Sequence, residues 1–351
     1  MRISAAWSLG SGAIRISRST ERTIRVTAGN RRWGFGGCLV ALLLAGNGAL
    51  PAAESYPNRP VRLVVGFGAG GPTDIPARFI AERLAPLLGQ NVVVENKPGA
   101  AGMLATRDVL AQPRDGYSLL LCTHFESINT VLYRNPQYTL RDLAPISLIT
   151  KYYYALALTN TVPAANFEQF VAYAKARPGQ VGYISIGIGS AQEILARQLE
   201  RLAGISMNRI PYRGGPQVMQ DLLSGIVQFY VAPTLAVMPQ YENRQLKVLA
   251  VSSPQRLAIA PEIPTLVEKG INFVRFGWLG ICAGAGTPEP IIDLLNRHIV
   301  AIVSSPAYQD LIEKAGSMPI ASSPAELASV LTQTVDDVAS TIREFGMEQE
   351  Q

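Results

Sequence analysis

Three glycine-rich turns stand directly before predicted helices, at residues 66–71, 187–190 and 212–216. A glycine turn at the start of a helix exposes backbone N–H groups that point in one direction, and the helix dipole adds partial positive charge there. Such a turn can bind an anion without a basic side chain. Turns of this kind in both halves of a two-lobed protein could hold a dicarboxylate across a cleft, although each could also serve only as a tight turn.

The first turn, Gly66-Phe-Gly68-Ala-Gly-Gly71, also matches the dinucleotide-binding pattern G-x-G-x-x-G. It follows a predicted strand, and Glu95 ends the next strand, where a dinucleotide fold has its ribose-binding acid. An exported nucleotide-dependent oxidoreductase is therefore an alternative interpretation. However, the predicted helix starts after the motif, at Thr73, and the sequence has no Tyr-x-x-x-Lys pair. The pattern favours anion binding, and we expect no cofactor.

Groups that catalysis or metal binding would need are sparse. The chain contains two histidines, His124 and His298, and lacks the patterns G-x-S-x-G, H-E-x-x-H and C-x-x-C. Those patterns are typical of hydrolase nucleophiles, zinc sites and redox or metal sites. Acidic residues show no spacing that singles out a general acid/base pair. We therefore expect a binding protein, not an enzyme, and no metal site.

The net charge of +5 comes from the first 53 residues. Seven of the 31 basic residues and one of the 26 acidic residues lie there, so the remaining chain is nearly neutral and offers no footprint for nucleic acid. Arg31-Arg32 precedes the apolar run Cys38-Leu-Val-Ala-Leu-Leu-Leu-Ala45 and small residues up to Ala53. This order is typical of a secretory signal peptide, and the run is short for a membrane span. We predict a leader over 1–53 and export to the periplasm.

Two cysteines, Cys122 and Cys282, follow the predicted leader. An oxidising compartment permits a disulfide between them. Both lie in apolar, strand-like runs, which favours two buried thiols, and both alternatives stay open.

The elements that would position the turns alternate along the chain. Strand-like runs are expected at 61–65, 92–94, 118–122, 145–158, 181–186, 227–231, 246–251 and 273–282. Helices are expected at 73–88, 166–176, 190–202, 216–223, 264–269, 287–303, 307–315 and 323–345. This alternation predicts an α/β fold with mainly parallel sheets flanked by helices. In the predicted capping box Ser190-Ala-Gln-Glu193, the Glu193 carboxylate would bond the Ser190 N–H and add negative charge near the second turn.

Several segments occur in a characteristic order: Ala69-Gly-Gly-Pro-Thr-Asp74, Val93-Val-Glu-Asn-Lys-Pro-Gly99, Asp115-Gly-Tyr-Ser-Leu-Leu120, Ile210-Pro-Tyr-Arg-Gly-Gly215 and Ala283-Gly-Ala-Gly-Thr-Pro288. In these segments the chain resembles the tripartite tricarboxylate transporter substrate-binding proteins, a TctC-like family also called Bug receptors. The resemblance covers nearly all of 56–345. It implies a two-lobed periplasmic-binding-protein fold of type II, a Venus flytrap. Lobe 1 would comprise 54–152 plus 276–351, and lobe 2 would comprise 153–275.

The resemblance also implies a function. The chain would be an extracytoplasmic solute receptor that binds a small carboxylate, such as a di- or tricarboxylate, an amino acid or an aromatic acid. Its partners would be the membrane subunits of a tripartite tricarboxylate transporter, and it would act as a monomer without nucleic acid. A ligand-sensing protein that signals to a membrane partner is an alternative.

In such receptors loop amides and hydroxyl groups hold the ligand. The implied site residues are Ala69, Gly70, Gly71, Thr73, Asp74, Thr123 and His124 in lobe 1, and Gly189, Ser190, Ala191, Gln192, Tyr212, Gly214 and Thr234 in lobe 2. Three of them have other interpretations. Asp74 could be a first-turn helix acid, His124 a buried histidine with internal partners, and Tyr212 an aromatic residue on the lobe surface.

Overall fold

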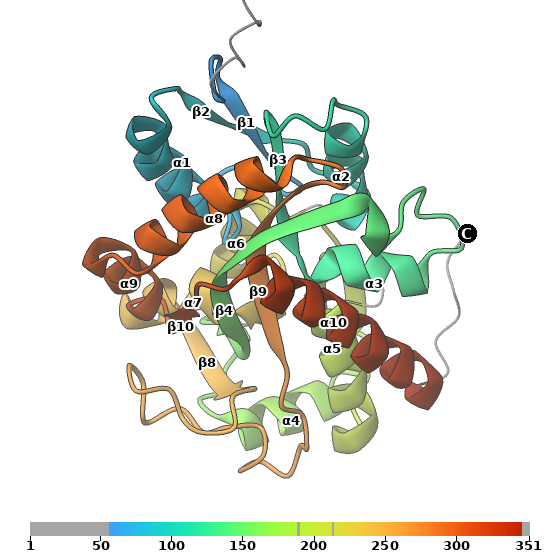
Figure 1. Ribbon diagram of the computed structural model, residues 1–351. Coiled ribbons are helices and arrows are strands. Elements are labelled where there is room, and N and C mark those ends of the chain that lie inside the picture. The colour runs from blue at the N-terminus through green and yellow to red at the C-terminus, as the bar shows by residue number, and fades with distance from the viewer. Residues whose placement is uncertain (1–55, 188–189, 213, 346–351) are drawn as a thin grey trace, which may run out of the picture. The chain divides into compact units, whose positions relative to one another are not determined.

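The computed structural model describes residues 56–187, 190–212 and 214–345. The predicted leader, with its cleavage near Ala53, lies outside the described residues, as does Gly189. The described residues form one compact unit. Its fold is α/β, with a central sheet flanked by helices, as predicted (Figure 1). No helix within the described ranges is long and apolar enough to cross a membrane.

The sheet begins with three parallel strands in the order β2-β1-β3. They are β1 (Val61–Val65), β2 (Val92–Asn96) and β3 (Ser118–Thr123), connected by α1 (Asp74–Leu88), the 3-10 turn η1 (Ala100–Gly102) and α2 (Met103–Leu110). β1 is almost entirely buried because helices cover both faces of a parallel sheet. α1 packs one apolar face inward, whereas Ile75 and Leu87 stay exposed. After β3 the chain enters α3 (His124–Leu132), which the sequence patterns did not predict.

Two long strands form the centre of the sheet. The 3-10 turn η2 (Leu140–Asp142) leads into β4 (Leu143–Thr159), which pairs antiparallel with β9 (Phe276–Gly284) up to Tyr153. From Tyr154 onward β4 pairs instead with β7 (Phe229–Pro233) and β8 (Leu246–Val251). β4 therefore belongs to two groups of strands. We call them the first half, which comprises β2, β1, β3, β9 and β10 (Ser317–Pro319), and the second half, which comprises β7, β5 (Gly182–Ser185), β6 (Asn208–Pro211) and β8.

The second half repeats the alternation of strand and helix. Its elements are α4 (Phe167–Lys175), β5 (Gly182–Ser185), α5 (Ala191–Ala203), β6 (Asn208–Pro211), α6 (Pro216–Ser224) and α7 (Thr234–Glu242), in addition to β7 and β8. β6, β5 and β7 are parallel neighbours. Parallel pairing thus holds for β2-β1-β3 and for β6-β5-β7, whereas β4 pairs antiparallel with its neighbours β9, β7, β8 and β10.

The prediction of a helix at 264–269 is wrong. This segment forms turns, in which the Glu268 N–H donates to Thr265 Oγ1 and the Thr265 N–H donates to Glu268 Oε2. Leu266 also donates its N–H to the carbonyl oxygen of Val251, as an added strand would. Gly270, in the left-handed region at φ 79°, ends the segment before a helix can build up.

The chain ends with three helices and a short strand: α8 (Glu289–Val303), α9 (Pro306–Glu313), β10 (Ser317–Pro319) and α10 (Pro324–Phe345). α8 packs on α1 and β4, and α10 packs on α3 and β4. α8 packs with Leu279 and Ile281 of β9, whereas α10 packs with Trp278 and Cys282, and because these residues alternate along the strand the two helices lie on opposite faces. Both helices therefore cover the central strands.

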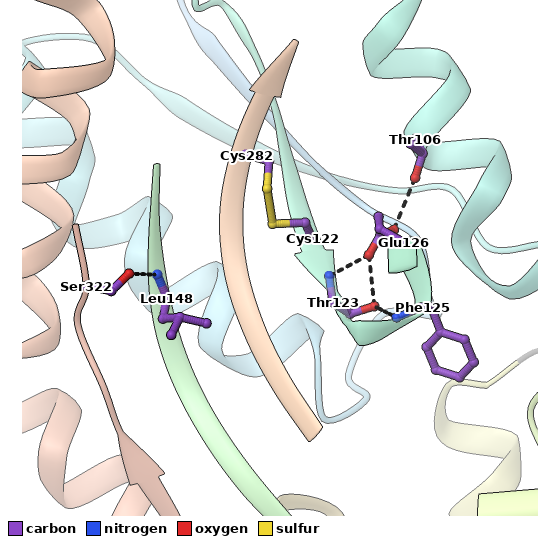
Figure 2. The surroundings of a disulfide bond; sticks show 8 residues. All are labelled: Thr106, Cys122, Thr123, Phe125, Glu126, Leu148, Cys282 and Ser322. Atoms are coloured by element: carbon purple, nitrogen blue, oxygen red, sulfur yellow. Dashed lines mark hydrogen bonds between the residues drawn. A yellow bond between two sulfur atoms is a disulfide. The ribbon is translucent and has the colours of Figure 1, made fainter. Parts of the chain in front are cut away.

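A disulfide joins Cys122 in β3 to Cys282 in β9, so the interpretation as two buried thiols is wrong (Figure 2). β3 and β9 are antiparallel neighbours, with Leu120 opposite Cys282 and Cys122 opposite Gly280. This register brings the two Cα atoms within 5.9 Å, although 160 residues separate them in the sequence. The pairing depends on the register between distant strands, which the local apolar pattern does not reveal.

Candidate functional site

A cavity of about 240 Å³ lies where the two halves of the sheet meet. Its walls come from the loop after β1, the end of β3, the loops after β5 and β6, and the end of β7. All of these are carboxyl ends of parallel strands, where ligands bind in α/β folds. The helices that follow are α1, α3, α5, α6 and α7, and residues at the start of each line the cavity. Because the first N–H groups of a helix lack intrahelical partners, this wall is rich in hydrogen-bond donors.

The structure brings about half of the predicted site residues to this wall. Those that line the cavity are Gly70, Gly71, Thr73, Thr123, His124, Gln192 and Gly214. Ala69 is exposed outside it. Gly189 lies outside the described residues, and Ala191 is described only as the first residue of α5. The remaining four, Asp74, Ser190, Tyr212 and Thr234, are not among the residues that line it.

The Asp74 side chain stabilises the first glycine turn through hydrogen bonds. Its buried carboxylate accepts hydrogen bonds from the Gly70 N–H (2.8 Å), Arg78 Nε (2.6 Å) and Asn96 Nδ2 (2.8 Å). Burial raises its pKa, but the hydrogen bonds from Arg78, Gly70 and Asn96 hold the pKa below the ordinary value for aspartate. Asp74 therefore fixes the shape of the turn, and it takes up the N–H of Gly70.

The second turn ends in a helix cap that differs from the predicted capping box. Ser190 Oγ accepts from the Glu193 N–H, but the Ser190 N–H donates to Gly187 O and not to Glu193. The Glu193 carboxylate turns instead to two arginines, Arg197 at 2.8 Å and Arg209 at 3.5 Å. The expected bond is wrong because two cations attract this carboxylate more strongly than one neutral amide. Its negative charge is therefore compensated away from the cavity wall.

Two polar side chains on the cavity wall lack partners among the described residues. Gln192 is only 1% exposed, yet neither Oε1 nor Nε2 makes a hydrogen bond to any described residue. Thr73 Oγ1 is in the same condition, and it makes no cap bond to α1. Buried polar groups without hydrogen bonds are costly and rare in native proteins. Both residues line the cavity, so a ligand bound there is a candidate partner for these groups.

His124 lies at the cavity floor between two tyrosines. Its Nδ1 is 3.4 Å from Tyr152 Oη and its Nε2 is 3.4 Å from Tyr154 Oη. Burial lowers the pKa of His124 from 6.5 to about 4, although the Trp278 backbone opposes this shift. The imidazole is therefore neutral at neutral pH and can donate one N–H but supplies no positive charge.

Thr123 is positioned by a buried carboxyl group. Glu126 accepts from the Thr123 N–H and from Thr123 Oγ1, and Thr123 Oγ1 in turn accepts from the Phe125 N–H (Figure 2). Thr106 Oγ1 also donates to Glu126 from α2. Burial raises the pKa of Glu126 to about 7 despite these hydrogen bonds. This capping box fixes the start of α3, where Thr123, His124 and Phe125 line the cavity.

The first and third turns touch each other across the cavity. A Cβ atom added to Gly68 would lie 2.8 Å from the Cα of Gly215, closer than van der Waals contact allows. Gly68 itself has no left-handed φ, so its lack of a side chain serves this approach and not its own backbone. Gly215, at φ 87°, needs glycine for both reasons. The two halves of the sheet therefore meet backbone to backbone at this point.

Tyr212 and Thr234 have partners outside the main cavity. Tyr212 donates its hydroxyl hydrogen to Asp221 and lines a second cavity of about 200 Å³ that shares Phe67 and Ile186 with the first. Thr234 is buried and bonds Ser317 Oγ at 3.1 Å. Neither side chain needs a ligand to satisfy it.

Sequence reasoning missed several cavity residues. Tyr152 and Tyr230 reach it from β4 and β7, and Met219 and Gln240 reach it from α6 and α7. In the sequence, Tyr152 and Tyr230 resemble the other apolar strand residues. Gln240 lies in the last turn of α7 (Thr234–Glu242), a helix that the sequence patterns did not predict.

The dinucleotide-binding interpretation needs Glu95 as the acid that binds the ribose, and the contacts of Glu95 do not support this role. Glu95 in β2 accepts from Arg62 Nε and pairs with Arg62 at 2.8 Å, so its carboxylate is already bound to a side chain of β1. α1 begins at Asp74, after the third glycine of the motif. The described residues also hold no group of three histidine, cysteine or acidic side chains placed to bind a metal ion.

Comparisons with known proteins agree on one family. Residues 76–347 match the tripartite tricarboxylate transporter family receptor. The periplasmic binding protein BugD is 33% identical, and the match covers 84% of this chain and 100% of BugD with a TM-score of 0.80.

Two further similar structures contain a ligand. Rpa4515 of R. palustris, solved with adipate, is 28% identical over 82% of this chain and 98% of its own, with a TM-score of 0.77. MatC (Rpa3494) from Rhodopseudomonas palustris, solved with bound malate, is 25% identical over 82% of this chain and 100% of its own, with a TM-score of 0.76. Adipate and malate are both dicarboxylates.

Proposed function

The chain belongs to the tripartite tricarboxylate transporter receptor family, and from this premise we propose that it is an exported receptor that binds a small carboxylate and delivers it to the membrane subunits of such a transporter. The family is one of periplasmic solute-binding receptors, not of enzymes. Adipate and malate in related proteins make a carboxylate the expected class of ligand.

One observation carries the proposal. The buried amide of Gln192 has no partner among the described residues, and it lines a cavity where five helices begin. A carboxylate can accept hydrogen bonds from Nε2 of this amide, from Thr73 Oγ1 and from the first N–H groups of the helices. Hydrogen bonds to an ionised group are stronger than neutral ones, so an anion offsets the cost of burying these donors.

Closure of two lobes around the ligand is the second part of the proposal. β4 changes its pairing partners between Tyr153 and Tyr154, next to the proposed lobe boundary at 152 and 153. β9 begins at Phe276, at the proposed return to lobe 1. Two crossing strands support a hinge, and the contact of Gly68 with Gly215 supports a closed state.

Calorimetry on purified protein tests the binding function. The titrants are adipate, malate, hexanoate, phenylacetate and an amino acid, with NAD as the control for the oxidoreductase alternative. We expect at least one carboxylate to bind and to raise Tm by mass action, and NAD to leave Tm unchanged. Binding of NAD alone would overturn the proposal.

Export and delivery need separate measurements. Amino-terminal sequencing of the protein from a periplasmic fraction should start near residue 54, and a start at Met1 would contradict export. Cells that contain the membrane subunits should take up labelled ligand only when this receptor is present. Uptake at the same rate without the receptor would remove its role in delivery.

A further inference from the structure

Glu126 carries a buried carboxyl group that is one hydrogen bond away from the cavity wall. Its side chain is only 2% exposed, and it does not line the cavity itself. The Oε2 atom accepts hydrogen bonds from the Thr123 N–H and from Thr123 Oγ1, the latter at 3.0 Å. Thr123 lines the cavity, so the residue that a ligand would contact is also the residue that the carboxyl group holds.

The other oxygen of the carboxyl group has a partner that accommodates both protonation states. Thr106 Oγ1 lies 3.1 Å from Glu126 Oε1 and 3.4 Å from the carbonyl oxygen of Gly102. When Glu126 is ionised, Thr106 donates its hydroxyl hydrogen to Oε1. When Glu126 is protonated on Oε1, the acid donates to Thr106 Oγ1, and Thr106 donates to Gly102. Glu126 can therefore gain a proton without losing a hydrogen bond.

The charge of Glu126 decides how firmly the Thr123 hydroxyl hydrogen is held. Thr123 Oγ1 already accepts from the Phe125 N–H at 3.1 Å, and it has one hydrogen to donate. An ionised Glu126 holds that hydrogen in a charge-assisted bond, which is stronger than a neutral one. A protonated Glu126 offers a neutral oxygen, so a ligand carboxylate in the cavity becomes the stronger acceptor. The ionised form also repels that carboxylate in a buried region of low dielectric constant.

The groups that immediately surround Glu126 keep their charge near neutral pH. β3, β9 and η1 carry no titratable side chain apart from the two cysteines of the disulfide. His124 on the same helix is neutral, because burial lowers its pKa to about 4. Tyr138 donates its hydroxyl hydrogen to the Glu126 carbonyl oxygen, and burial raises the pKa of Tyr138 well above its ordinary value. Arg107 of α2, which lies near Tyr138, stays cationic.

Three acids lie on other elements that pack against α3. Asp108 of α2 is bound by Lys97, and Asp142 of η2 accepts from the Thr139 N–H. Asp337 of α10 lines a cavity of about 110 Å³ together with His124. Because this cavity adjoins the start of α3, a test of Glu126 needs Asp337 as its control.

We propose that carboxylate binding by this receptor takes up a proton on Glu126, which acts as a positioning residue for the Thr123 hydroxyl group. This inference rests on the proposed receptor function and adds to it a dependence on pH. The proton comes from solvent and stays on Glu126 Oε1, while Thr123 turns its hydroxyl hydrogen to the ligand. Burial raises the pKa of Glu126 to about 7, so roughly half of the ligand-free protein holds this proton at pH 7. Affinity is therefore highest below pH 7 and is lost as the pH rises through 7.

Calorimetry between pH 6.5 and pH 8 measures this coupling, with whichever of adipate, malate and hexanoate binds. If only the protonated form binds, Kd is inversely proportional to its fraction and rises by up to about eightfold over this range. Titrations at pH 7 in two buffers of different ionisation enthalpy should show uptake of about half a proton per bound ligand. A constant Kd without proton uptake overturns the inference and leaves the receptor function intact. Failure of every carboxylate to bind overturns both.

Substitutions assign the proton to its residue. Glu126→Gln stays uncharged at every pH and has an amide that can donate to Thr106, so its Kd should not change between pH 6.5 and pH 8. Thr123→Val removes the hydroxyl group and should reduce the pH dependence to the part caused by charge repulsion, whereas Thr123→Ser should retain it. Asp337→Asn should keep the wild-type pH dependence. A folded Glu126→Gln protein with the wild-type pH dependence, or its loss in Asp337→Asn, contradicts the inference.

Discussion

The contact between Gly68 and Gly215 allows a direct test of closure. In Gly68→Ala the new Cβ would lie 2.8 Å from the Gly215 Cα, which is backbone and cannot rotate away. The backbone of Gly68 itself tolerates alanine, because its φ is outside the left-handed region. If the two halves are lobes that separate in the absence of ligand, the substitution strains only the closed state.

The size of the effect follows from the overlap. Inserting a methyl group into a packed contact typically costs about 1–3 kcal/mol. If this cost falls on the closed state alone, ligand affinity decreases by about 5- to 150-fold. The free energy of unfolding of the ligand-free protein should stay unchanged, because the open state already relieves the contact.

Calorimetry with whichever of adipate and hexanoate binds the wild-type protein measures the affinity, and thermal unfolding without ligand measures the stability. Gly89→Ala is the matched control. Gly89 ends α1 at φ 67°, and a Cβ there would meet nothing within 4 Å. Alanine in this left-handed conformation costs about 1–2 kcal/mol, so Gly89→Ala should lower Tm by a few degrees and leave affinity unchanged.

The reverse result would refute the reasoning. If Gly68→Ala lowers Tm without ligand and retains wild-type affinity, the contact is a permanent part of one rigid body. The proposed hinge in β4 and β9 would then be absent.

Three further predictions concern groups at or near the cavity. Gln192→Leu removes a buried amide without partners among the described residues, so Tm should stay the same or rise. The Kd for the carboxylate ligand should rise at least about tenfold. Calorimetry that gives an unchanged Kd would remove Gln192 from the ligand site. Replacing both Cys122 and Cys282 by alanine should lower the free energy of unfolding in urea by about 2–5 kcal/mol. In wild-type protein denatured without reductant, neither cysteine should react with an alkylating reagent. Alkylation of both thiols would contradict the disulfide. The pKa of Glu126 is raised by burial from 4.5 to about 7, so its folded form holds a proton that the unfolded chain releases, and stability is lost as the pH rises from about 4.5 through about 7. Glu126→Gln should abolish up to about 3 kcal/mol of this loss between pH 4.5 and pH 8 in urea unfolding, and the same pH dependence in both proteins would contradict the assignment.

Local signals in the sequence determined most of the elements and the character of the site. Apolar runs bounded by glycine and proline predicted β1 and β3, and helical spacing predicted α1 and α5, because these patterns depend on residues a few positions apart. Glycine turns before helices indicated where donors would gather, and the cavity lies at those turns. The order of short motifs was enough to indicate the family.

Tertiary structure decided what distant segments do to each other. Whether Cys122 pairs with Cys282 depends on the register of β3 against β9, across 160 residues. Asp74 and Glu193 looked similar in sequence, as acids at the start of helices, but the folded chain supplies arginines that turn both of them away from the cavity. Gln192 lacks a partner among the described residues only because two halves of a sheet bring their helix ends together. Hydrogen-bond satisfaction and local polarity depend on every neighbour in space, and neighbours in space are set by packing and not by spacing along the chain.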